Sequence, residues 1–107
     1  MSPDERFAAL VGEFAGIEEV TPPSPTRTFG AATLRVNGKI FAMLTEQRLV
    51  VKLPKARVDA LVDAGEGVRF DANRAVPMRE WLSLDPASVL PWSSLAREAL
   101  EFVRSLA

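Results

Sequence analysis

The sequence has 107 residues, of which 48% are hydrophobic and 25% charged, so its length and composition fit one globular domain and exclude a disordered chain. It contains no Cys, His or Tyr, which excludes disulfides, thiolate metal ligands, a cysteine nucleophile and a histidine general base. The net charge is only −1, but residues 27–79 carry ten Lys or Arg against five acids. The middle of the chain is therefore basic, with a net charge of +5, and the two ends are acidic.

Amphipathic helices are predicted near both ends of the chain. Ser2, Pro3 and Glu5 match a capped helix start, and apolar residues then recur at helical spacing, which predicts a helix over residues 3–15. The same spacing recurs after Pro91 and predicts a final helix that continues to the end of the chain. Residues 20–25 include three prolines and are expected to form an extended connector.

The strongest strand signal lies in the first part of the basic segment. Asn37 and Gly38 separate two apolar runs, residues 32–36 and 39–45, and this dipeptide predicts a β-hairpin closed by a type I′ turn. A second turn at Glu46-Gln47 leads to a third strand over residues 49–53. We expect these three strands to form an antiparallel meander.

Shorter elements are predicted in the second half of the chain. Helical spacing indicates a helix over residues 55–64, and apolar residues predict strands at 68–70 and 78–84. The predicted order is thus α-β-β-β-α-β-β-α. Because the strands are grouped rather than alternating with helices, we expect an α+β fold, a two-layer domain with an antiparallel sheet.

Several segments, taken in order, resemble a known family: Phe29-Gly30, Val36–Ala42, Leu49–Leu53, Pro77–Trp81 and Trp92–Val103. They are similar to the TfoX/Sxy N-terminal domain family, which belongs with the MmcQ/YjbR group of small domains, and the similarity covers about residues 26–104. The resemblance implies that residues 1–107 are a single domain of this type, with a double-wing α+β arrangement. It also implies a regulatory accessory protein that binds DNA. At Ala72–Val76 the chain departs from the family, which often has glycines before its Pro-Met pair.

Basic residues of the middle segment are the candidate nucleic-acid contacts. Lys and Arg side chains neutralise phosphates, so cations that fold onto one face favour a polyanionic partner. The alternative is that they are the solvated charges of an ordinary half-exposed sheet, and both interpretations stay open. Lys52 is either an anion contact or an edge lysine that discourages association. The candidates are Arg27, Arg35, Lys39, Arg48, Arg74 and Arg79.

Other functions are kept as alternatives. One is a protein-interaction module, such as a homodimer formed through a strand edge, and another is a small-ligand domain that uses the polar loop Asp71–Arg74. Trp81 is either a stacking surface for an exposed base or a core residue. Serines and carboxylates are scattered and glycines occur singly, so we expect no enzyme activity, catalytic residue, cofactor or metal. No apolar stretch approaches the ~20 residues of a membrane span, and we expect a cytoplasmic protein without a membrane partner.

Overall fold

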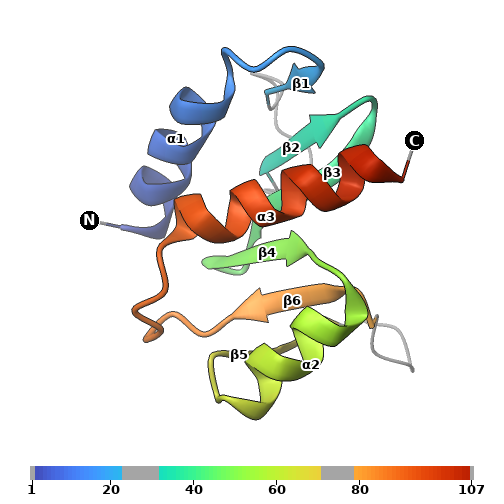
Figure 1. Cartoon of the computed structure of the whole chain (residues 1–107). Helices are drawn as coiled ribbons and strands as arrows, with labels where there is room; N and C mark the ends of the chain where they lie inside the picture. Colours follow the sequence, from blue (N-terminus) through green and yellow to red (C-terminus); the bar gives the residue numbers. More distant parts are fainter. Residues whose placement is uncertain (1, 23–31, 71–78, 107) are drawn as a thin grey trace.

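Three helices and a six-stranded antiparallel sheet make up the part of the chain that the computed structural model describes, residues 2–22, 32–70 and 79–106 (Figure 1). The fold is α+β, and the predicted order of elements is confirmed with one additional strand. The helices are α1 (Pro3–Phe14), α2 (Lys55–Asp63) and α3 (Trp92–Ser105). The strands are β1 (Val20–Thr21), β2 (Ala32–Val36), β3 (Lys39–Thr45), β4 (Arg48–Lys52), β5 (Gly67–Arg69) and β6 (Trp81–Leu84).

The sheet has the strand order β1-β2-β3-β4-β6-β5, so the predicted meander of β2, β3 and β4 is confirmed. Asn37 and Gly38 have φ angles of 53° and 80°, the left-handed values that a type I′ turn requires. The next turn repeats this geometry without glycine, since φ is 53° at Glu46 and 67° at Gln47. β6 lies between β4 and β5, which places it beside the meander.

The additional strand β1 lies within the segment predicted to be a connector. Val20 pairs with Val36, and the backbone N–H of Asn37 donates to the Glu19 carbonyl at 3.0 Å. Val20 and Thr21 are β-branched and still carry a backbone N–H, whereas Pro22 does not, so the strand ends there. The proline-rich part of the connector after Pro22 lies outside the described residues.

The core lies between the helices and one face of the sheet. α1 has the predicted capping box, with Ser2 Oγ accepting from the Glu5 N–H at 3.2 Å, and it buries Phe7, Leu10 and Phe14. α3 crosses β2, β3 and β4, and α2 packs on β5 and β6 (Figure 1). Strand residues from this face join the helix residues in one buried cluster, which includes Leu34, Val36, Leu49, Val51, Leu82 and Leu84.

Alternate residues of the same strands point to the opposite side of the sheet, which we call the second face. It carries Arg35 on β2, Arg48 and Lys52 on β4, and Trp81 on β6, since each of these neighbours a residue of the core cluster. The helices thus leave the predicted basic strand residues on the side away from the core. No helix in the described ranges is long and apolar enough to cross a membrane.

Candidate nucleic-acid interface

Four cations considered from the sequence lie at one end of the sheet. In an antiparallel sheet the ends of β2 and β4 lie beside the starts of β3 and β6, and Figure 1 shows this end on the right. Arg35 is near the end of β2, Lys39 begins β3, Lys52 ends β4, and Arg79 lies just before β6. We call these four residues the cationic end.

Strand pairing sets how far apart these residues are. Arg35 pairs with Ile40 on β3, and Ala42 on the same strand pairs with Val51, the neighbour of Lys52. Arg35 and Lys52 are therefore separated by one strand, or roughly 10 Å at the usual spacing between neighbours. Lys52 in turn pairs with Trp81 on β6. The pairing places two cations and an indole in a line across the second face.

Exposure separates this set into two groups. The side chains of Arg35, Lys39 and Arg79 are exposed, and those of Lys52 and Trp81 are half-buried. The half-buried pair is in contact, because Lys52 Nζ lies 5.8 Å from the centroid of the Trp81 ring. Trp81 is thus neither a fully buried core residue nor a free side chain.

Arg48 is the predicted contact that the structure places elsewhere. It begins β4 opposite Thr45, at the other end of the sheet from Lys52. One of its guanidinium nitrogens, Nη2, donates to the Ser83 carbonyl at 3.2 Å, and its Nε is buried without a partner among the described residues. Arg48 therefore does not join the cationic end. Arg27, Arg74 and the loop Asp71–Arg74 lie outside the described residues.

Acidic residues do not pair with the cationic end in the described part of the chain. The five ion pairs there all use carboxylates of the helices, and none involves Arg35, Lys39, Lys52 or Arg79. The pairs are Lys55–Asp59, Arg57–Glu98, Arg69–Asp59, Arg97–Glu13 and Arg104–Glu101. Four of these pairs join two helix residues and the fifth joins Asp59 of α2 to Arg69 of β5, so the cations of the cationic end are left without an ion pair in the described part of the chain.

A groove lies at the cationic end, with a volume of about 500 Å³. Lys55 begins α2, whose N-terminus has no side-chain cap, so the positive end of the helix dipole also faces this region. The backbone N–H of Leu53, just after β4, donates to the carbonyl of Glu80, just before β6, at 2.9 Å, and this bond joins the two segments that line the groove. The groove was not predicted because it depends on β6 lying beside β4. Its lining residues are Lys52, Lys55, Arg79, Glu80 and Trp81.

Lys55 contributes less free charge to this groove than the other cations. Its Nζ donates to Asp59 at 2.7 Å, and Arg69 donates to the other carboxylate oxygen of Asp59. The hydrogen bonds from Lys55 and then Arg69 lower the pKa of Asp59 below its ordinary value, so the carboxylate stays ionised and keeps both cations paired. Lys52 and Arg79 are then the principal cations available to a ligand.

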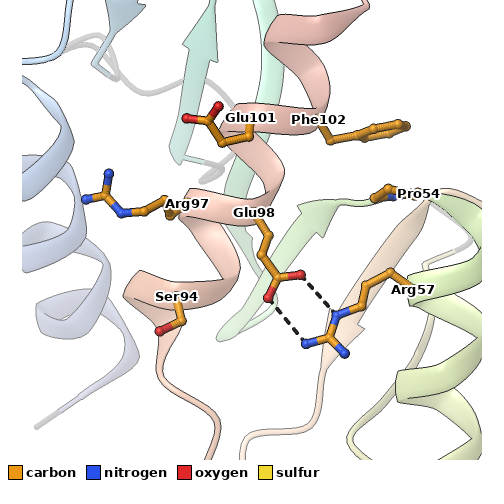
Figure 2. Close-up of a pocket in the computed structure, with 7 residues that line it drawn as sticks. All are labelled: Pro54, Arg57, Ser94, Arg97, Glu98, Glu101 and Phe102. Atoms are coloured by element: carbon orange, nitrogen blue, oxygen red, sulfur yellow. Dashed lines mark hydrogen bonds and ion pairs between the residues drawn. The ribbon is translucent and has the colours of Figure 1, made fainter.

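A larger hollow of about 690 Å³ lies between α2 and α3 (Figure 2). Arg57 and Glu98 form a two-bond ion pair across it, with donor–acceptor distances of 3.0 and 3.3 Å. Pro54 and Phe102 supply apolar surface, and Arg97 and Glu101 are ion-paired elsewhere. Size alone would favour this hollow as a binding site, but its charges are already paired, so it offers little to an anion. We therefore place the candidate interface at the cationic end.

No group of side chains suited to hold a metal ion occurs within residues 2–22, 32–70 and 79–106. Comparison with known proteins found no matching family model, no curated protein and no solved structure. The similarity to the TfoX/Sxy N-terminal domain family therefore stays a prediction, and function must be argued from the surface itself.

Proposed function

We propose that this protein is a small non-enzymatic domain of the TfoX/YjbR type that binds nucleic acid in a regulatory or accessory role, with the cationic end as its contact surface. The observation that carries the proposal is that the cationic end has no ion pair in the described part of the chain. There, helix acids pair with cations of the helices and with Arg69 of β5, while Arg35, Lys39, Lys52 and Arg79 have no ion-pair partner.

The arrangement of these cations favours contacts with phosphates over the alternative that they are ordinary solvated charges of a half-exposed sheet. Arg35 on β2 and Lys52 on β4, with one strand between them, can contact separate phosphates of a backbone, and each neutralised phosphate releases condensed counterions. Of the acids in residues 2–22, Asp4, Glu5 and Glu13 lie on α1, whereas Glu18 and Glu19 come just before β1, whose Thr21 pairs with Arg35 at this end. A net charge of −1 is compatible with a local anion-binding surface.

The alternative of a homodimer through a strand edge receives little support from the sheet. Its edge strands, β1 and β5, have two and three residues. Short edge strands are a common way to prevent association between sheets. Light scattering tests this alternative directly, because a strand-edge dimer would scatter at twice the chain mass of 11.7 kDa.

A titration of labelled oligonucleotides, followed by fluorescence anisotropy, tests the proposal. We expect binding at about 50 mM salt that weakens strongly at about 200 mM salt. Arg35→Gln and Lys52→Gln should each weaken binding, whatever the base sequence. Arg104→Gln, which removes the same charge from α3, is the matched control and should leave binding unchanged. Absence of binding at the lower salt, or equal losses in all three variants, would overturn the proposal.

A further inference from the structure

We infer that the groove at the cationic end takes an unstacked nucleobase against Trp81, while Lys52 and Arg79 contact the flanking phosphates, so that the preferred ligand is single-stranded nucleic acid. This inference rests on the proposed function, since it names the form of nucleic acid that the same surface binds. It assigns to Trp81 a role in recognition rather than in the core.

The position of Trp81 in β6 is the first observation. Leu82, Ser83 and Leu84, which follow it in the strand, are all buried, whereas Trp81 is only half-buried and lines the groove. Large aromatic side chains usually become buried when the packing permits it. Trp81 therefore keeps accessible indole surface at the place where the phosphate-binding side chains lie.

The other tryptophan provides an internal comparison. Trp92 is 7% exposed, belongs to the core cluster, and has the Arg6 guanidinium 4.1 Å from its ring centroid. It anchors the start of α3 and has little surface left for a ligand. The two indoles thus have different environments. Only Trp81 leaves part of its surface open in a groove lined by cations, as stacking on a nucleobase requires.

The chemistry of the groove fits a nucleotide unit. A volume of about 500 Å³ is in the range of small-ligand sites, and the lining combines an indole with three cations and one carboxylate, that of Glu80. An indole beside an excess of cations is the combination that binds single strands without base-specific contacts. Lys52 Nζ lies 5.8 Å from the indole centroid, so a phosphate on Lys52 places its own base near the ring. In a duplex the bases are stacked inside, and reaching Trp81 would require one of them to leave the stack.

Tryptophan emission tests the inference, because the chain has two tryptophans and no tyrosine. In a Trp92→Phe variant Trp81 is the only indole, and a single-stranded oligonucleotide should quench its emission with the same midpoint that anisotropy gives. The reciprocal Trp81→Phe variant keeps Trp92, whose emission should not change on binding. Circular dichroism confirms that each variant is folded.

A second test compares affinities and leaves Trp92 unchanged. It can therefore be used even if the Trp92→Phe variant fails to fold. Trp81→Leu should weaken binding of a single-stranded oligonucleotide about 5-fold to 150-fold, the range for losing one base–aromatic stack. Trp81→Phe should retain most of the affinity. An abasic oligonucleotide of equal length should bind the wild-type protein as weakly as the intact strand binds Trp81→Leu.

The outcomes distinguish this inference from the proposed function. If no oligonucleotide binds at low salt, the nucleic-acid function itself is wrong. If oligonucleotides bind but Trp81 emission stays constant and abasic and intact strands bind equally, the surface is a phosphate contact and the stacking role is wrong. Equal affinity of wild-type protein for duplex and single strand would also overturn the inference.

Discussion

Asp59 of α2 accepts a hydrogen bond from the guanidinium of Arg69 on β5, and this contact ties the helix to the edge strand of the sheet. The other carboxylate oxygen of Asp59 accepts from Lys55 at 2.7 Å, one helical turn earlier. A single carboxylate therefore joins the start of α2 to β5. Protonation of Asp59 should therefore weaken the attachment of α2 to β5.

The pH dependence of stability follows from this arrangement. The pKa of Asp59 is lowered below 3.8 by Lys55 and then Arg69, so its stabilising effect is complete above 3.8 and is lost as the pH falls through the lower, folded-state pKa. Asp59→Asn should lower the midpoint of thermal unfolding near neutral pH, and the difference from wild type should shrink at about pH 2. Asp63→Asn, at the exposed end of the same helix, is the control and should have little effect. A constant difference for Asp59→Asn at both pH values would contradict the prediction.

The close pairing of β5 with β6 makes Gly67 sensitive to substitution. A Cβ at this position would meet the Ser83 carbonyl oxygen and lie 3.1 Å from Leu84 Cα, both in the backbone of β6. Gly67→Ala should therefore reduce the free energy of unfolding by about 1–3 kcal/mol, measured by urea denaturation. Gly12→Ala, inside α1 with nothing within 4 Å of its added Cβ, should instead stabilise by about 0.5–1 kcal/mol. An unchanged free energy of unfolding in Gly67→Ala would contradict the close pairing of β5 with β6.

The turn between β3 and β4 uses left-handed backbone without glycine. Gln47 has φ of 67°, a conformation that costs an L-residue about 1 kcal/mol and glycine almost nothing. Gln47→Gly should therefore raise the free energy of unfolding by about 1 kcal/mol. The reciprocal change, Gly38→Ala in the β2–β3 turn, should lower it by a similar amount, because φ is 80° there although space is free. Opposite signs in the two variants are the expected result, and equal signs would contradict it.

Local signals account for the elements that could be predicted from the sequence. The capped start of α1 depends on Ser2 and Glu5, and the first hairpin depends on Asn37-Gly38, so both are determined by neighbouring residues. β1 could not be predicted in this way. It is a two-residue strand that exists because Val20 meets Val36, sixteen positions later in the chain.

The candidate site depends on contacts between distant segments, and the sequence indicated only part of it. The sequence named Arg35, Arg48 and Lys52 as cations of the strands, and the burial patterns of β2 and β4 put all three on the same face. Arg48 and Lys52 are four residues apart on one strand, or roughly 13 Å, which puts them at opposite ends of the sheet. The meeting of Lys52 with Trp81 requires β6 to pair with β4, and no local signal specifies that pairing.

The salt dependence of oligonucleotide binding tests the central claim most directly. The logarithm of affinity for a single strand should fall linearly with the logarithm of salt concentration, with a slope of about 0.7 for each phosphate that is neutralised. If Arg35 and Lys52 each contact a phosphate, the double variant Arg35→Gln/Lys52→Gln should reduce the slope by about 1.4. The double variant Arg97→Gln/Arg104→Gln, which removes two cations of α3, should keep the wild-type slope. Parallel lines for wild type and the Arg35/Lys52 variant, or an equal reduction in the α3 control, would contradict the account.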